Sequence, residues 1–394
     1  MLIEIHMIQN HGPANLNRDD LGAPKTCIFG GVTRARISSQ CLKRSIRRSP
    51  EFALTLERDG GVRTRRLIEE IAKAAAGGGQ PGDAHRKAIF KVFKDGGVTF
   101  PDNNEEEFKA LWFLPKTTIN ELGAAVKAGG DLGAAFARII GKCVGKEAIH
   151  VPDIALCGRM TEFDAKGPFN DLKGKFTVEA ALSAAHAIST HAVINEVDYF
   201  TAADDVPGQD AGGAYLDEAM FNSACFYKYF SINWDQLVKN LGDDNDVAST
   251  TIKCFLEAAA KANPSGKQHA FAAFNPPDGV LVEVKTKSAT PVSYANAFAD
   301  PVPDKSEHGL IGESIARLGQ YAHDLSEGYG IAADRFWFSP NLRHGLPWID
   351  KSRKEHEQEQ SVVGAGREFG SIDKLVDSVM ERVNACASRA VKTP

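Results

Sequence analysis

The sequence predicts a mixed α+β fold, and three observations indicate it. Apolar-rich or alternating segments typical of strands lie near the N-terminus, at residues 2–9 and 32–37. Between about residues 60 and 150, apolar residues instead recur at helical spacing, and glycine-rich stretches separate the segments. Strand-like segments then return at 149–157 and 184–193. We therefore expect a sheet domain that is interrupted by a helical insertion.

Length and composition set the general class. A chain of 394 residues exceeds one average domain, which predicts two or three subdomains. The chain has no run of about 18 apolar residues that could span a bilayer, and its first residues, M-L-I-E-I-H-M-I, predict a strand rather than a signal peptide. Seven scattered cysteines without a C-x-x-C pair indicate free thiols in a reducing, cytoplasmic compartment, and argue against disulfides or a zinc site.

The remaining elements follow from local patterns. Residues 10–30 are rich in glycine and proline, so we expect a loop there. The predicted helices are 62–76, 83–94, 104–112, 117–127, 132–144, 247–262, 313–327 and 371–389. The predicted further strands are 222–233 and 280–284. Residues 194–221 lack a sustained period, and a long excursion of this kind in a compact domain is typically functional or mobile.

A basic tract is the main candidate for a functional surface. Residues 25–48 contain seven Lys or Arg residues and no acid, although the chain has a net charge of −5. Ser38 or Ser39 can cap a helix in which Leu42 and Ile46 face the core. The other side carries Gln40, Lys43, Arg44, Arg47 and Arg48. Like charges four residues apart weaken an isolated helix. A polyanion along this face would remove that cost, so the tract predicts a positioned binding surface.

Phosphates are the anions that suit this arrangement. The free N–H groups at a helix N-terminus and the helix dipole attract phosphate, and Ser38, Ser39 and Gln40 lie there, with Lys43 and Arg47 one and two turns further on. We therefore predict RNA binding along the sugar–phosphate backbone. The alternative is a solvated basic helix face, in which Arg44 and Arg48 promote solubility or contact a neighbouring subunit.

Four further cations are candidates for the same surface. Arg34 and Arg36 share one face of a predicted strand, so both could reach phosphate. Lys25 and Arg18 lie in the loop before that strand. Arg18 could equally pair with Asp19 or Asp20 and shape the loop.

Few residues invite a catalytic interpretation. The paired carboxylates Asp19–Asp20 and Asp204–Asp205 could hold Mg²⁺, although hydrogen bonding within loops explains them equally. His186 and His191 are five residues apart, which suits neither a helix face nor a strand face, so we expect structural roles. The sequence lacks a Walker A string, a G-x-S-x-G motif and a Cys/His pairing. We expect no enzymatic activity, no cofactor and no metal.

Seven short strings occur in one order. They are N-R-D-D (17–20), F-G-G (29–31), R-x-R-I-S-S-Q-x-L-K-R (34–44), I-A-L-x-G-R-M (154–160), A-H-A-I-S-T-H (185–191), Y-F-T-A-A-D-D (199–205) and A-F-N-P (273–276). Each string alone is weak. Together, over residues 1–300, they make the chain resemble the CasC family, the backbone subunit of the type I-E Cascade effector of CRISPR defence.

The resemblance implies a fold shaped like an open right hand. It would have a palm on an RRM-like (ferredoxin-like) sheet, a helical fingers insertion and an extended thumb loop. The implied boundaries are 1–58 for the first palm part with the basic helix, 59–150 for the fingers, 151–193 for the returning palm strands, 194–222 for the thumb, 223–340 for the second palm part and 341–394 for a C-terminal segment with a charged run and a helix.

The resemblance also implies a function. Copies of such proteins stack head to tail on the CRISPR RNA spacer, hold its phosphates and expose bases in short segments that pair with target DNA, so that base pairing reads the sequence. The partners would be the guide RNA, target DNA, further copies of the chain and the Cascade subunits CasA, CasB, CasD and CasE, with no membrane involved. The family is not known for catalysis.

Some site residues are implied by the resemblance alone. In the family, positions matching Ser38, Gln40, Lys43 and Arg47 touch the guide backbone. Met160 would wedge beside a displaced nucleotide, whereas a lone methionine is otherwise core filler. Tyr199, Phe200, Thr201 and Leu216 would belong to the thumb, where the family commonly has a tryptophan in place of Tyr199.

Two other classes of protein remain as alternatives. One is a metal-dependent ribonuclease of the type III backbone kind, which cuts target RNA with an acid in the loop after the first strand. The other is a generic RRM-type single-strand binder that forms no filament. The F/Y-rich strings of ordinary RRM domains are missing, which argues against the latter.

Overall fold

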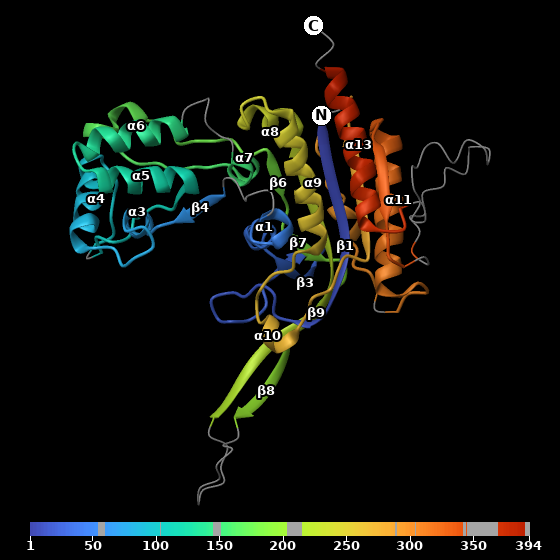
Figure 1. Cartoon of the computed structure of the whole chain (residues 1–394). Helices are drawn as coiled ribbons and strands as arrows, with labels where there is room; N and C mark the ends of the chain where they lie inside the picture. Colours follow the sequence, from blue (N-terminus) through green and yellow to red (C-terminus); the bar gives the residue numbers. More distant parts are fainter. Residues whose placement is uncertain are drawn as a thin grey trace, which may run out of the picture. The chain divides into compact units, whose positions relative to one another are not determined.

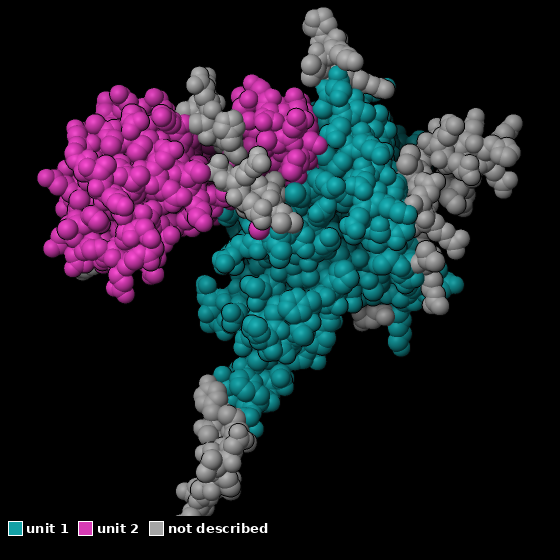
Figure 2. All heavy atoms as spheres, viewed as in Figure 1, with its two compact units in different colours: residues 1–52, 184–231, 253–394 teal, residues 53–183, 232–252 magenta. Residues whose placement is uncertain are grey.

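The computed structural model confirms a mixed α+β fold (Figure 1). It describes the chain except residues 54–59, 103, 145–150, 203–214, 288–289, 304, 342–343, 345–368 and 391–394. The charged run at 351–359 and the pair Asp204–Asp205 lie outside the described residues. The chain forms two compact units, one of residues 1–52, 184–231 and 253–394 and the other of residues 53–183 and 232–252 (Figure 2).

An antiparallel sheet organises the first unit. Its strands follow the order β11–β10–β1–β9–β7–β3–β2, and β6 and β8 also pair with β9. The bounds are β1 Leu2–Ala14, β2 Thr26–Phe29, β3 Val32–Ile37, β6 Leu182–Ala184, β7 Ala187–Ser189, β8 Glu196–Ala202, β9 Tyr215–Asn233, β10 Gly279–Lys285 and β11 Asp334–Phe338. The predicted strands at 32–37, 222–233 and 280–284 are confirmed.

Strand β1 is buried over its first eight residues after Met1 because it lies between two strands and is covered on both faces. Ile3, Ile5 and Met7 point to one side, and register pairs them with valines of β10. Gly279 of β10 is required by packing, because a Cβ there would collide with the indole of Trp337. The sheet is thus closely packed on the side that carries β10 and β11.

Helices and short helical turns complete the first unit. Their bounds are α1 Ser39–Arg47, α2 Pro50–Ala53, α9 Asn245–Lys261 (of which residues 253–261 belong to this unit), α10 Gln268–Phe271, η3 Ala295–Phe298, α11 Gly309–Tyr329 and α13 Ile372–Ala390. Ile315, Leu318 and Ala322 of α11 are buried in one cluster with Ile8 of β1 and Trp337 of β11. The helices predicted at 247–262, 313–327 and 371–389 are confirmed.

The second unit is largely helical around an aromatic core. Its elements are β4 Gly61–Thr64, α3 Leu67–Ala75, α4 Asp83–Asp95, β5 Trp112–Pro115, α5 Lys116–Ala128, α6 Leu132–Val144, α7 Pro152–Cys157, η2 Gly167–Leu172 and α8 Trp234–Asn240. Phe93 contacts four other rings edge to face, among them Trp112, Phe136 and Phe169. Such pairs add about 0.5–1.5 kcal/mol each beyond area burial. Among the described residues, no helix combines the length and apolar character that a bilayer span requires.

Four predicted elements were wrong in whole or in part. Of the helix expected at 62–76, residues 62–64 belong to strand β4 and α3 begins only at Leu67. Residues 10–14 continue β1, so Gly12 and Pro13 lie within a strand, and residues 26–29 form β2. Residues 152–157 form a helix that starts at Pro152, so the expected strand there is a helix with proline at its first position. Residues 104–111 form no helix, and Trp112 instead begins β5.

Candidate nucleic-acid interface

Helix α1 forms as the sequence predicts, and its N-terminus is capped. The Oγ of Ser38 accepts the Cys41 N–H at 3.2 Å. Leu42 and Ile46 are buried, at 3% and 4% exposure, which confirms the predicted core side. Lys43 and Arg47 are half-buried, and Arg44 and Arg48 are exposed. The helix is therefore anchored by two aliphatic side chains and presents its cations outward.

The loop of residues 15–25 is tied to this helix and to the hairpin strand β9. Asn17 Oδ1 accepts the Ser38 N–H at 2.9 Å, and the Lys25 N–H donates to the Asn17 carbonyl at 2.9 Å. Asn15 Nδ2 donates to the carbonyls of Gly22 and Met220 at 2.9 and 2.8 Å. These bonds fix the loop that carries Arg18 and Lys25 beside the N-terminus of α1.

Six of the predicted cations have no acidic partner. Arg18, Lys25, Arg36, Lys43, Arg44 and Arg48 form no ion pair within the described part of the chain. Burial lowers the pKa of His186, and the positive charges of Arg36 and Lys25 lower it further. Uncompensated cations on a chain of net charge −5 concentrate positive potential on this one surface.

The prediction for Arg34 was wrong. Its side chain is fully buried, and its guanidinium donates to the carbonyls of Phe29, Ser189 and Phe298 at 3.1, 3.1 and 2.7 Å. Burial lowers its pKa. Arg34 therefore fastens the β2–β3 turn to β7 and to η3 and is unavailable to a phosphate. Its strand neighbour Arg36 is half-buried and donates to the Thr26 carbonyl at 3.3 Å.

The sequence argument missed Lys228. It lies in the middle of β9, is 1% exposed and has no ion-pair partner among the described residues. Burial lowers its pKa to about 8. Burial also raises the pKa of Cys41 in the first turn of α1, while the charges of Lys228, Arg44 and Lys25 oppose that rise. A lysine inside the aromatic string F-Y-K-Y-F was the signal that could have identified this buried charge.

Strands β8 and β9 form a projecting hairpin in Figure 1. Register pairs Tyr199 with Glu218, Phe200 with Asp217 and Thr201 with Leu216. Tyr199 is 68% exposed and Phe200 is 42% exposed. The predicted loop at 194–221 is thus a two-stranded ribbon over its described residues, and it carries aromatic rings that no core covers.

Met160 lies in the second unit, where Arg159 fixes the chain. Arg159 is buried and donates to the carbonyls of Phe176 and Phe113 at 3.0 and 3.2 Å. Met160, the next residue, is 75% exposed. Core filling is therefore excluded for Met160, and its contact with a nucleotide stays a prediction.

The polar groups considered for catalysis have local partners. The Asp19 carboxylate accepts the N–H groups of Leu21 and Ala23, each at 2.9 Å, which shapes its own loop. His191 Nε2 lies 3.3 Å from the Cys225 N–H. These bonds support the structural interpretations of Asp19 and His191.

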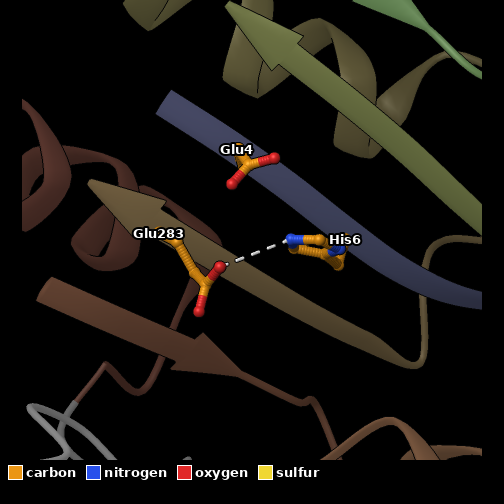
Figure 3. A group of neighbouring side chains, drawn as sticks. All are labelled: Glu4, His6 and Glu283. Atoms are coloured by element: carbon orange, nitrogen blue, oxygen red, sulfur yellow. Dashed lines mark ion pairs between the residues drawn. The ribbon is translucent and has the colours of Figure 1, made fainter. Parts of the chain in front are cut away.

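Glu4, His6 and Glu283 form a fully buried cluster between β1 and β10 (Figure 3). Lys285 pairs with Glu4, and Arg335 Nε lies 2.5 Å from Glu283 Oε1. Two carboxylates therefore face two cations. Burial alone would raise the pKa of Glu283, but His6, Arg335 and Lys285 lower it to about 2. The carboxylates of Glu4 and Glu283 are already balanced by the charges of Lys285 and Arg335. We therefore interpret the cluster as a structural ion network.

Fold and surface together define the class: an α+β protein with an open sheet and a cationic helix on which Lys43, Arg44 and Arg48 form no ion pair among the described residues. The chain belongs to the CT1975-like protein family, whose model matches residues 3–362. A solved chain described as "CRISPR RNA-guided surveillance complex, pre-nicking" is 29% identical, with a TM-score of 0.78 over 97% of this chain and 100% of that one. Another, described as "CRISPR RNA-guided surveillance complex", is 25% identical, with a TM-score of 0.58 and the same coverage. The curated proteins include no match.

Proposed function

We propose that this protein is the CasC-type backbone subunit of a type I-E Cascade. It acts in the cytoplasm, binds the spacer of a CRISPR RNA through phosphate contacts and presents bases in short segments to target DNA. The observation that carries the proposal is the similarity, over 97% of the chain, to a chain of an RNA-guided surveillance complex. The cations of α1 and its loop, of which Lys25, Lys43 and Arg44 form no ion pair among the described residues, supply the chemistry that a phosphate backbone requires.

The order of the central strands supports an RRM-like palm. Four neighbouring strands run β10–β1–β9–β7, so the fourth, first, third and second lie side by side. Helix α1 follows the first of these strands along the chain, and α9 follows the third. This order is similar to the βαββαβ arrangement of a ferredoxin-like sheet and supports the RRM-like palm that we propose.

The exposed hairpin supports a thumb that acts on a neighbour. Val197 and Tyr199 are on one face of β8, and Met220 is the register partner of Val197. All three side chains are at least 36% exposed. A two-stranded ribbon with apolar residues in solvent is marginal alone and gains stability from a partner. We propose that this partner is the guide strand beneath the next copy in a head-to-tail filament, which CasD and CasE cap at its ends, with CasA and CasB as further subunits.

We propose a scaffold rather than an enzyme. Of the pair Asp19–Asp20 that a type III ribonuclease mechanism could use, the Asp19 carboxylate is engaged by two backbone amides of its loop. The recognition of sequence then rests on base pairing alone, so guides of any sequence should bind.

The test is expression of the full chain with its genomic neighbours and a CRISPR transcript. The purified protein should carry RNA of one defined length, visible as a raised ratio of absorbance at 260 and 280 nm and as one band after extraction. That band should keep its length in Mg²⁺. A folded protein that purifies free of nucleotide and alone would overturn the proposal, and shortening of the RNA in Mg²⁺ would indicate the ribonuclease.

The thumb assignment gives a separate prediction. Replacing Tyr199 and Phe200 by alanine should weaken target-DNA binding by about tenfold or more while the guide is retained, because stacking contributes on the order of 1–3 kcal/mol per base. Gel-shift titration of guide-loaded complex with target DNA measures this. Tyr329→Ala, which removes a ring on α11 that is 79% exposed, is the control. Equal loss of guide and DNA would contradict the assignment.

A further inference from the structure

Phe274 is an exposed ring for which the proposed function gives no role. It belongs to the A-F-N-P string and is 66% exposed. It lines a surface hollow of about 500 Å³ together with Arg44, Arg48 and Lys261. All four residues belong to the first unit. Hollows of about 300–1,000 Å³ are the size that accommodates a nucleotide-sized ligand.

The loop that carries Phe274 is held firmly from beneath. Gln9 Nε2 donates to Asn263 Oδ1 at 3.0 Å and to the Asn275 carbonyl. Gln268, 7% exposed, donates to the carbonyls of Pro264 and Ala273 at 2.8 and 3.3 Å. These bonds fix both ends of the 263–275 segment. The ring of Phe274 is therefore presented to solvent by a pre-organised support.

The backbone of this loop is also strained. Lys267 and Ala272 have φ values of 51° and 50°, a left-handed conformation that is costly for residues other than glycine. Gly266 approaches the loop after β1 so closely that a Cβ would collide with the Leu16 carbonyl. Strain of this kind persists where the surrounding structure determines a conformation that serves a site.

The charges around the hollow favour an anion. Arg44 and Arg48 have no ion pair among the described residues, whereas Lys261 lies 3.8 Å from Asp373. Glu51 is the acid in the lining. A second hollow of about 510 Å³ shares Arg44, Ser45 and Ser265 with the first and adds Arg18, Asp19 and Asp20. The two hollows therefore adjoin at Arg44, and the positive excess belongs to the first, which has three cations and one acid in its lining.

We propose that this hollow is a stacking site for one base of a single-stranded nucleic acid, with Phe274 as the platform and Arg44 and Arg48 as the phosphate contacts. Every base offers a π-face, and cations beside an exposed ring are the elements of sequence-tolerant single-strand binding. The site rests on the proposed function and extends it to a second stripe of α1. It also lies near the hairpin, because Phe271 of α10 contacts Phe221 of β9 at 5.8 Å between ring centroids (Figure 1).

The test uses the purified full chain and fluorescein-labelled 12-nucleotide RNA and DNA of mixed sequence, with fluorescence anisotropy as the readout. Phe274→Leu keeps an apolar side chain and should weaken binding about tenfold. Phe274→Trp should restore it. Tyr329→Leu removes a ring that is 79% exposed elsewhere in the same unit and should change nothing. Ultraviolet cross-linking of 4-thiouridine RNA, followed by peptide mass spectrometry, should map to residues 263–278.

The outcomes separate this site from the proposed function. Loss of RNA binding alone identifies the guide as the occupant, and loss of both RNA and DNA binding identifies any single strand. If the unaltered chain binds RNA but Phe274→Leu binds it equally and no cross-link maps to the loop, the stacking site is overturned and the scaffold function stands. If light scattering instead shows that Phe274→Leu abolishes self-association with RNA binding unchanged, the face contacts a second copy and the proposal fails. A chain that binds neither RNA nor DNA overturns both.

Discussion

A chain carrying Lys43→Glu and Arg47→Glu together is expected to lose guide RNA by at least about 100-fold at 0.15 M salt. The two residues lie one turn apart on α1, whose capped N-terminus and buried Leu42 and Ile46 hold the helix in place. Reversing both charges replaces two attractions to phosphate by two repulsions. Extraction and sizing of co-purified RNA measure the loss.

A matched control exists on α4. Lys87 and Lys91 are also four residues apart and are more exposed than the half-buried Lys43 and Arg47. Lys87→Glu with Lys91→Glu makes the same change in net charge. This control should retain RNA. A milder pair, Lys43→Gln with Arg47→Gln, should reduce the slope of log K against log salt by about 1.4, because each phosphate contact to a single strand contributes about 0.7. Normal RNA content in the Glu variant, with an unchanged melting temperature, would contradict the assignment of α1.

Replacing Glu283 by glutamine is expected to destabilise the protein by about 3–5 kcal/mol at pH 7. The change removes the buried negative charge that faces Arg335 at 2.5 Å and Lys285 at 3.7 Å, and removing one member of a buried ion network is costly. Urea unfolding followed by far-ultraviolet circular dichroism measures this. Glu313→Gln breaks an ion pair of 2.9 Å between half-exposed residues and should cost at most about 1 kcal/mol. Equal losses in the two variants would show that the buried network does not stabilise the sheet.

The same carboxylate gives a pH dependence with a definite sign. The pKa of Glu283 is about 2 in the folded protein, against an ordinary value of 4.5. The folded state therefore binds fewer protons than the unfolded state between these values. Its stabilising contribution is complete above about pH 4.5 and disappears as the pH falls toward 2. Glu283→Gln should therefore reduce the pH dependence of the free energy of unfolding between about pH 2 and pH 4.5. An unchanged pH dependence in this range would contradict the interpretation.

Sequence reasoning predicted the elements whose period is strong. Leu42 and Ile46 four residues apart, with Ser38 before them, were sufficient to place α1 and its cap. The segment ending at Cys157 misled the prediction because six residues are too few to distinguish a buried helix from a strand. The loop prediction for residues 10–14 was wrong because tertiary partners can bury polar residues in a central strand, as they bury His11.

The candidate site was predictable in part. The cationic face of α1 could be read from spacing, since helical geometry alone decides which residues oppose Leu42 and Ile46. The burial of Arg34 could not be predicted from spacing, because it depends on the carbonyls of Ser189 and Phe298, which are more than 150 residues away along the chain. Phe274 was also missed, since its exposure depends on Gln9 and Gln268 fixing a loop.

Strand β9 is one uninterrupted stretch of 19 residues, which at about 3.3 Å per residue is about 60 Å long. Its first part pairs with β8 at residues 196–202, and its later part pairs with β7 at Ile188 and Ser189. The same backbone therefore forms one strand of the projecting hairpin and a central strand of the sheet. Because no loop or break separates the two parts of β9, a force on the hairpin is transmitted along a continuous strand into the sheet. Opening of the hairpin therefore requires loss of the pairing between β8 and β9 rather than rotation about a hinge within β9.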